Sequence, residues 1–324
     1  MRDYLQLVRY PNLLIVALTQ YSMRWGVIDP MLSASSANLP NAEFSLQLSS
    51  LHFFLLVMST ICLTAAGYVI NDYFDTHTDF LNRPRKVLVG TKIPRRHAMA
   101  FHIILNVVGV LIGFYMSFHI GLPLFGFIFL LVSGILYFYS TTYKRQFLVG
   151  NLLVAILTGL VPLMVILFEL PELNKAYGEV LIKHNTNPMY IFYWIIGFSV
   201  FAFLTNFIRE VIKDMEDFEG DSAYGRNSIP VVLGIKNSKI IVNVFIIITL
   251  SLLAFVYFQY LKDQITLIYF SLFLFLPFLF LIYKTMKANN KSDYHLIGNG
   301  LKIIMLTGII YAFVARFIIQ TQIL

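Results

Sequence analysis

The chain is poor in charged residues, which make up only 13% of its 324 positions. A soluble globular domain usually carries about 25%, whereas here hydrophobic residues reach 58% and the mean hydropathy is +0.74. This scarcity of charge excludes a large soluble core and indicates a protein that resides in a membrane.

Cysteine is almost absent as well, because Cys62 is the only one in the sequence. A disulfide within the chain is therefore excluded.

No small-residue cleavage site follows the first apolar run, so "MRDYLQLVRYPNLLIVALTQYSM" is interpreted as a first spanning helix and not as a signal peptide. The net charge of +7 is not accompanied by the aromatic–basic pattern typical of RNA binding, which argues against nucleic acid as a partner.

Long apolar runs are abundant, and nine of them approach the length of about 20 residues that a spanning helix needs. They lie roughly at 11–28, 50–70, 97–117, 119–139, 147–168, 189–209, 239–259, 264–284 and 298–319. We therefore expect an all-α membrane protein with about nine transmembrane helices. These helices should form a bundle around a central cavity, partly polar and partly apolar, that opens near the cytoplasmic face. Residues 1–324 are expected to form one domain with two halves, roughly 1–145 and 146–324.

Basic residues are distributed unequally between the two sides of this arrangement. Nineteen Lys and Arg fall in the amino terminus and the alternate loops on its side, and five fall on the other side. Because positive residues accumulate on the cytoplasmic side, this pattern predicts a multi-pass protein of the cell membrane with a cytoplasmic amino terminus.

Acidic residues gather at two places, each at the predicted cytoplasmic end of a span. The first is "VINDYFDTHTDFLNRPRK", residues 69–86, and the second is "REVIKDMEDFEGDSAYGRNSIPVVLG", residues 209–234. At about 100° per residue, each set falls on one helix face, within roughly 100° for the first and roughly 60° for the second. The sets are Asn71, Asp72, Asp75 and Asp79, and then Glu210, Asp214, Asp217 and Asp221.

Bunched carboxylates repel one another unless a cation neutralises them. Asp and Asn oxygens suit Mg²⁺, which commonly bridges to substrate phosphates. The pattern thus predicts a diphosphate held by Mg²⁺ on one side and by basic side chains on the other. The predicted metal ligands are Asn71, Asp75, Asp79, Asp214, Asp217 and Asp221, with Asn71 and Asp72 also near the substrate. The predicted basic contacts are Arg83, Lys86, Lys144, Arg145, Lys213 and Arg226.

These two segments resemble the signatures of a known family, the UbiA superfamily of intramembrane prenyltransferases. "NDYFDTHTD" is similar to its NDxxDxxxD motif, and "DMEDFEGD" is similar to its DxxDxxxD motif, about 140 residues further on. The resemblance implies a helical membrane bundle that transfers a prenyl group from a polyprenyl diphosphate with the help of Mg²⁺. It places Asp75, Asp217 and Lys144 in catalysis.

Shorter matches extend the resemblance. "RYPNLL" resembles the family's entry to the first span and implies Asn12 at the pocket, while "YSTTYKR" implies diphosphate contacts by Tyr143 and Lys144. The second segment is most similar to the branch that transfers geranylgeranyl to geranylgeranylglyceryl phosphate, an ether-lipid precursor. That branch usually reads NRPxRPIPSG after the first motif. Here "NRPRKVLVGTK" has Lys86 in place of Arg and Val87 in place of Pro.

Other acceptors and other functions remain open at this point. Within the family, an aromatic quinone precursor such as hydroxybenzoate or dihydroxynaphthoate competes with the lipid acceptor, whereas haem farnesylation is disfavoured because the second segment keeps its Asp residues. An ion or phosphate transporter usually holds its ions near the membrane midplane, not at span ends. A phosphatidyl-type transferase needs a DG…AR pattern that this chain lacks.

Aromatic side chains near the motifs are candidates to shield a carbocation-like carbon through their ring faces. They are Tyr68, Tyr73, Phe74, Tyr137 and Tyr139. Asn151 and Asn206 are polar residues inside spans and serve either the site or contacts between helices.

Overall fold

The structure, a computed structural model, describes residues 1–38, 43–82, 87–183 and 189–323. Within these ranges the elements are helices, apart from an isolated bridge between Val89 and Ile93 in the loop after α4. The predicted all-α class is therefore confirmed.

Eight of the helical segments are long and apolar enough to cross a membrane, within the ranges just given. They are Ser50–Thr76, Arg95–His119, Pro123–Thr141, Val149–Val180, Met189–Glu216, Ile229–Leu261, Gln264–Lys287 and Lys291–Thr321. The corresponding helices are α4 (Ser50–Asn82), α5 (Arg95–His119), α6 (Gly126–Thr141), α7 (Val149–Lys183), α8 (Met189–Glu216), α10 (Ile229–Val256), α11 (Gln264–Phe270) with α12 (Leu276–Lys287), and α13 (Lys291–Ile323). Each coincides with a predicted span, so the protein is a multi-pass membrane protein.

The ninth predicted span, 11–28, is helical, and it belongs to a longer helical stretch made of three consecutive segments. They are α2 (Tyr10–Tyr21), the π-helical η1 (Ser22–Ile28) and α3 (Asp29–Asn38), which follow the short α1 (Arg2–Leu7). This segment is not among the eight candidate spans of the described residues, so the predicted nine is one more than the structure has. The π-helical stretch contains the buried Arg24, which interrupts the apolar run.

The contacts of Arg24 show how this segment is held in place. Its guanidinium donates to the carbonyl of Leu48 and lies 4.4 Å from the centre of the Phe53 ring. Glu169 of α7 lies 3.7 Å away, and its Oε1 accepts from the backbone N–H groups of Gln47 and Leu48 at 2.6 and 2.9 Å. One buried ion pair thus ties η1, the extended stretch before α4 and α7 together.

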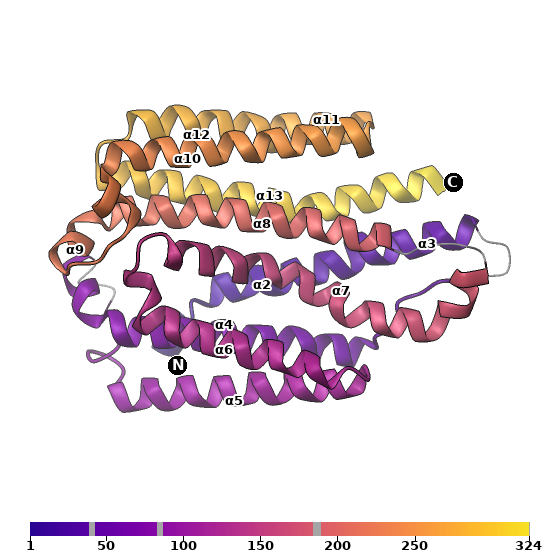
Figure 1. Cartoon of the computed structure of the whole chain (residues 1–324), viewed down its shortest axis with the longest axis horizontal. Coiled ribbons are helices and arrows are strands. Elements are labelled where there is room, and N and C mark those ends of the chain that lie inside the picture. Colours follow the sequence, from indigo (N-terminus) through magenta and orange to yellow (C-terminus); the bar gives the residue numbers. More distant parts are fainter. Residues whose placement is uncertain (39–42, 83–86, 184–188, 324) are drawn as a thin grey trace.

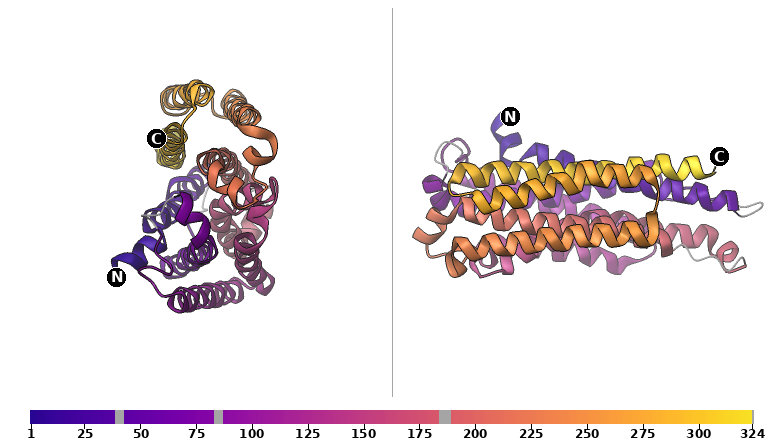
Figure 2. Two further views of the ribbon diagram at one scale, coloured as in Figure 1. Left: turned by 90° about the vertical axis from the view of Figure 1, so that its left-hand side faces the viewer. Right: turned by 90° about the horizontal axis from the view of Figure 1, so that it is seen from above.

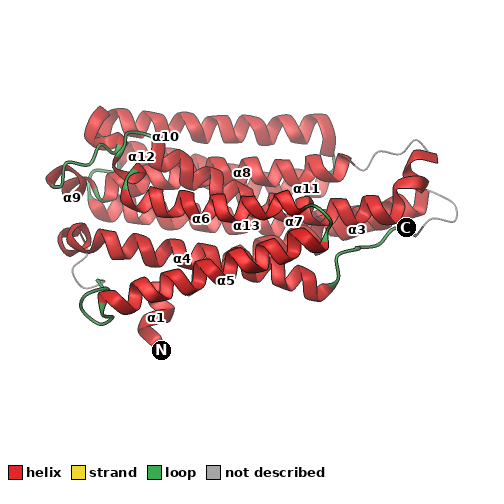
Figure 3. Ribbon diagram, turned by 60° about the horizontal axis from the view of Figure 1, so that its bottom comes forward, coloured by secondary structure: helices red, strands yellow, loops and turns green. Residues whose placement is uncertain are grey.

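The helices run roughly parallel to the long axis, and their connections gather at two ends (Figures 1 and 3). The two chain termini lie towards opposite ends of the bundle (Figures 1 and 2). The short α9 (Phe218–Ala223) lies at one end, beyond α8 and in contact with α4. Both acidic segments therefore come together at the same end of the bundle.

The apolar interior is continuous across the two predicted halves. One core cluster joins Phe53 of α4, Phe129 of α6 and Phe168 of α7 with Ala312 of α13. A second cluster packs α8 against α10, α12 and α13 around Phe207 and Phe278. The helices that carry the acidic segments, α4 and α8, are thus both fixed by buried contacts on several sides.

Candidate active site

The first acidic segment forms the last turns of α4, as its spacing predicts. Asn71, Asp72 and Asp75 lie on one unbroken helix, and the carboxylate of Asp75 is buried, with 9% of the side chain exposed. The side chain of Asp79 and residues Arg83 and Lys86 lie outside what the structure describes.

Two cations from distant parts of the chain converge on Asp75. Lys144 Nζ, on the short 3₁₀ turn η4 (Tyr143–Arg145), lies 2.6 Å from Asp75 Oδ1 and 3.4 Å from Asn71 Oδ1. Arg226, in the loop after α9, donates Nη2 to the same Asp75 oxygen. A buried carboxylate is thereby neutralised by two basic groups.

Arg226 also joins the two acidic segments directly. Its Nη1 donates to Asp221 Oδ1 at 3.2 Å, while its Nη2 binds Asp75. The predicted meeting of the two acidic clusters is therefore realised through one guanidinium. The site accommodates positive charge between carboxylates of both segments.

Burial and these ion pairs shift the pKa values of Lys144, Asp221 and Arg226 in opposite directions: burial favours the neutral form of each group, and its ion pair favours the charged form. Burial lowers the pKa of Lys144, and the nearby Asp75 offsets this only in part. Burial likewise raises the pKa of Asp221, because Arg226 does not fully compensate for the loss of solvent. For Arg226 the balance is reversed: burial disfavours its charge, but Asp75 and Asp221 together outweigh that cost and raise its pKa.

The second acidic segment is not a single helix, which corrects the prediction. Helix α8 ends at Glu216, and Asp217 (φ −96°, ψ 9°) stands at the start of α9. The break places Asp217, Glu219 and Asp221 at the amino-terminal end of a new helix, where the helix dipole favours negative charge. Asp214 stays on α8, where its Oδ2 accepts from Asn151 Nδ2 of α7 at 2.8 Å.

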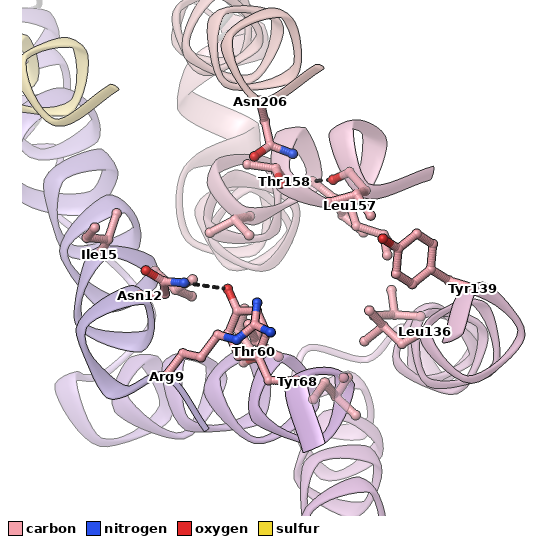
Figure 4. A pocket seen from close by; sticks show the side chains of 18 of the residues that line it. Arg9, Asn12, Ile15, Thr60, Tyr68, Leu136, Tyr139, Leu157, Thr158 and Asn206 are labelled. Atoms are coloured by element: carbon pink, nitrogen blue, oxygen red, sulfur yellow. Dashed lines mark hydrogen bonds between the residues drawn. The ribbon is translucent and has the colours of Figure 1, made fainter. Parts of the chain in front are cut away.

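A cavity of about 260 Å³ opens beside these groups, between α2, α4, α6, α7, α8 and α13. Figure 4 shows Arg9 and Asn12 on one side of its open centre, Tyr139 on another and Asn206 on a third. Its polar lining consists of Arg9, Asn12, Tyr68, Asn71, Tyr139, Asn206, Arg209, Glu210, Lys213 and Lys302, with threonines deeper in.

The rest of the lining is apolar and lies deeper in the bundle. It includes Leu63, Ile128, Phe129, Val132, Leu160 and Met164. Tyr139 and Phe129 are ten residues apart on α6, so at 1.5 Å per residue the cavity runs about 15 Å along the bundle. A smaller cavity of about 80 Å³ shares Ile15, Val16, Thr158, Val161 and Met305 with it. The arrangement suits an amphiphile with a charged head and a long apolar chain.

Several predicted residues line this cavity or its rim. Asn71 and Lys213 line it directly, and Asn12 Nδ2 donates to the Tyr68 hydroxyl at 3.2 Å. Asp72 pairs with the turn before α2, because its Oδ1 accepts from Arg9 Nη2 at 2.8 Å.

In the part of the chain that the structure describes, two other predicted residues, Arg145 and Tyr143, make their contacts away from the cavity. Arg145 is exposed, and it is its backbone carbonyl that accepts from the N–H of Asn227. Tyr143 contacts Phe138 at 6.4 Å between ring centres. Among the aromatic candidates, Tyr68 and Tyr139 line the cavity, whereas Tyr137 is 41% exposed.

Sequence reasoning missed four charged residues of the cavity: Arg9, Arg209, Glu210 and Lys302. In the sequence, the three basic residues are explained by the excess of positive charge on the cytoplasmic side, so nothing marked them as residues of a site. Only the position of Glu210 on the same arc as Asp214 pointed towards the site.

The donor set suits Mg²⁺ in its chemistry, because it offers Asp and Asn oxygens and no thiolate or imidazole. In the described part of the chain, no three His, Cys, Asp or Glu side chains converge closely enough to form a ready-made metal cage. The carboxylates of Asp75 and Asp221 instead face one guanidinium from both sides. This matches Mg²⁺ sites that use few protein ligands and complete their shell with substrate phosphates.

Comparison with known proteins identifies related chains. Digeranylgeranylglyceryl phosphate synthase of Methanosphaera stadtmanae is 28% identical over 265 residues, which is 80% of this chain and 86% of the relative. The enzyme of the same name from Methanobrevibacter smithii is 27% identical over 315 residues, covering 97% and 96% of the two chains.

The fold is also that of solved structures. A UbiA homolog from Archaeoglobus fulgidus bound to GPP and Mg²⁺ superposes with a TM-score of 0.59 at 17% identity, covering 96% of this chain and 99% of the homolog. The model of the UbiA prenyltransferase family matches residues 37–315, which contain both acidic segments, seven of the eight long apolar helices and most of the eighth. The chain therefore belongs to the UbiA prenyltransferase family.

Proposed function

We propose that this prenyltransferase moves a geranylgeranyl group from its diphosphate to geranylgeranylglyceryl phosphate in a Mg²⁺-dependent reaction. The observation that carries the proposal is the junction of Asp75, Arg226 and Asp221 at the polar end of an apolar cavity. The names of the related synthases support the choice of acceptor.

In this proposal the diphosphate lies between the two acidic segments. Asn71, Asp75, Asp79, Asp214, Asp217 and Asp221 are the residues that would hold Mg²⁺. When bound, Mg²⁺ supplies positive charge that stabilises the departing diphosphate. Lys144 and Arg226 would turn from Asp75 towards the phosphate oxygens and add direct charge-assisted hydrogen bonds.

The cavity walls would then protect the reacting carbon. The allylic C–O bond breaks as its electron pair leaves with the diphosphate, and the positive carbon lies near the ring faces of Tyr68 and Tyr139. The apolar lining holds the prenyl chain and excludes water, which would otherwise compete with the acceptor. The hydroxyl of the glyceryl group attacks this carbon, and its proton passes to the released diphosphate.

We further propose that the end of the bundle with α9 faces the cytoplasm. The predicted positive side of the chain includes Lys144, Arg226 and the basic residues after α4, and such residues accumulate on the cytoplasmic side. A water-soluble by-product such as diphosphate would then leave towards the cytoplasm. Labelling of single cysteines placed at Ser222 and at Asp263 tests this, because only the first should be protected in sealed right-side-out vesicles.

The acceptor is tested by a product assay on purified protein in detergent. Geranylgeranyl diphosphate and Mg²⁺ are supplied with geranylgeranylglyceryl phosphate, hydroxybenzoate or dihydroxynaphthoate in parallel, and products are read by mass spectrometry. The proposal expects a prenylated glyceryl phosphate and little prenylated ring. Efficient prenylation of a ring alone would overturn the choice of acceptor while leaving the family unchanged.

A further inference from the structure

We propose that Arg209 and Lys302, assisted by Arg9, form a second anion subsite that binds the phosphate of the acceptor, apart from the diphosphate subsite. This inference rests on the proposed function and adds the residues that select the acceptor. They come from α8, α13 and the turn before α2, which are far apart in the sequence.

The cations near the active site fall into two groups. Lys144 and Arg226 are bound by the carboxylates of Asp75 and Asp221, and neither of them lines the cavity. Arg9, Arg209 and Lys302 line the cavity, together with Lys213. Two anionic groups, one on each substrate, therefore have separate sets of partners.

The charge of the cavity lining favours an anion. The lining holds four cations and one carboxylate, that of Glu210, and a second carboxylate, that of Asp72, lies beside Arg9. Arg209 Nη1 lies 2.7 Å from Glu210 Oε1, and Arg9 pairs with Asp72. These two pairs orient the guanidinium groups and leave the set with an excess of positive charge. Direct hydrogen bonds from Arg and Lys suit a phosphate monoester.

The position of Lys302 fits the shape of the acceptor. Lys302 is an exposed residue at the rim of the cavity. Met305 lies one turn deeper on α13 and lines both cavities. Three residues of helix correspond to about 4.5 Å. A phosphate held at Lys302 would therefore stay near water while the attached prenyl chain passes Met305 into the apolar region.

The geometry thus selects an amphiphile with a phosphate head and an apolar tail over the same molecule without its phosphate. The test compares geranylgeranylglyceryl phosphate with geranylgeranylglycerol as acceptors for the wild type, Lys302→Gln and Arg209→Gln. Lys302→Arg is the conservative rescue variant, and Lys236→Gln, an exposed lysine of α10 outside the cavity, is the matched control.

Each Gln variant should raise KM for the phosphate acceptor about tenfold, the value for one lost charge-assisted contact of about 1.4 kcal/mol. KM for geranylgeranyl diphosphate and the use of geranylgeranylglycerol should change less than about twofold. Lys302→Arg should restore most of the affinity, and Lys236→Gln should behave as the wild type. Unchanged discrimination between the two acceptors in both Gln variants would overturn the subsite.

A binding measurement separates this inference from the proposed function. The thermal midpoint of the purified protein in EDTA is recorded with geranylgeranylglyceryl phosphate or geranylgeranylglycerol, without any donor. The subsite predicts that the phosphate raises the midpoint more, and that Lys302→Gln and Arg209→Gln remove the difference. If the wild type binds the phosphate in this way yet forms no product from it, the proposed function fails and the subsite stands. If product forms but neither binding nor KM depends on Lys302 and Arg209, the subsite fails alone.

Discussion

Lys144 Nζ and Asp75 Oδ1 lie 2.6 Å apart, and both side chains are at least nine-tenths buried. The lysine belongs to the turn after α6 and the aspartate to α4, and the same carboxylate also accepts from Arg226. Charges at such depth are costly unless they are paired. The pair lies beside Asn71, which lines the polar end of the apolar cavity, and this arrangement suits the proposed diphosphate with its long prenyl chain.

Removing the charge of Asp75 should abolish most of the activity. Asp75→Asn keeps the shape of the side chain but leaves Lys144 and Arg226 without their buried counterion and removes a proposed metal ligand. Turnover of the diphosphate should fall about 100-fold or more, the scale of losing one key electrostatic contact. The rate of product formation measures this, with Asp3→Asn, which alters an exposed carboxylate, as the control. Full activity of Asp75→Asn would contradict the proposed site.

Asp217 should affect the requirement for metal more than the fold. It lies at the amino-terminal end of α9 and is only partly buried, so Asp217→Asn should leave expression unchanged. The Mg²⁺ concentration for half-maximal activity should rise about tenfold or more, as expected when a ligand is weakened. A Mg²⁺ titration of activity measures the shift. Glu219→Gln, two residues further on and exposed, should not show it.

The depth of the cavity should set the length of the donor chain. Thr158 lines both cavities, and Thr158→Phe should fill the passage between them. The ratio of kcat/KM for geranylgeranyl diphosphate to that for geranyl diphosphate should fall at least about tenfold, because buried methylenes of the longer chain lose their place. Ile156→Phe on the outer face of the same helix, where the side chain is 54% exposed, should keep the wild-type ratio.

The ion pair between Arg24 and Glu169 should govern stability. Arg24→Met leaves the fully buried Glu169 carboxylate without its countercharge and should cost about 3–5 kcal/mol. The double variant Arg24→Met with Glu169→Leu should recover much of this loss, since neither charge is then buried alone. Thermal unfolding in detergent measures both. Equal destabilisation by the single and the double variant would show that the pair has no such role.

Helix spacing was sufficient to predict that the first acidic segment continues the helix of its span. Asn71, Asp72 and Asp75 follow an apolar run without Gly or Pro after Gly67, so the helix continues through them and keeps them on one face. The spacing of the second segment suggested the same for Asp214, Asp217 and Asp221. Instead α8 ends at Glu216 and α9 packs against α4, a contact between distant segments that no local pattern encodes.

The cavity lining was less predictable for a related reason. Arg9, Arg209 and Lys302 sit where basic residues serve membrane topology in any such protein, and only the assembled bundle brings three of them to one cavity. Conversely, Arg145 neighbours Lys144 in sequence, yet the 3₁₀ turn directs one side chain inwards and leaves the other exposed. A basic pair in a sequence does not tell which member faces the site.

The most direct test of the account is the Mg²⁺ dependence of geranylgeranyl transfer in the purified wild type and in Asp75→Asn. Geranylgeranylglyceryl phosphate is the acceptor, and both the prenylated product and the released diphosphate are quantified. We predict that EDTA stops both in the wild type, that Mg²⁺ restores them in equal amounts, and that Asp75→Asn yields neither. Transfer that persists in EDTA, or that survives the loss of Asp75, would contradict a single Mg²⁺-dependent diphosphate site built from the two acidic segments.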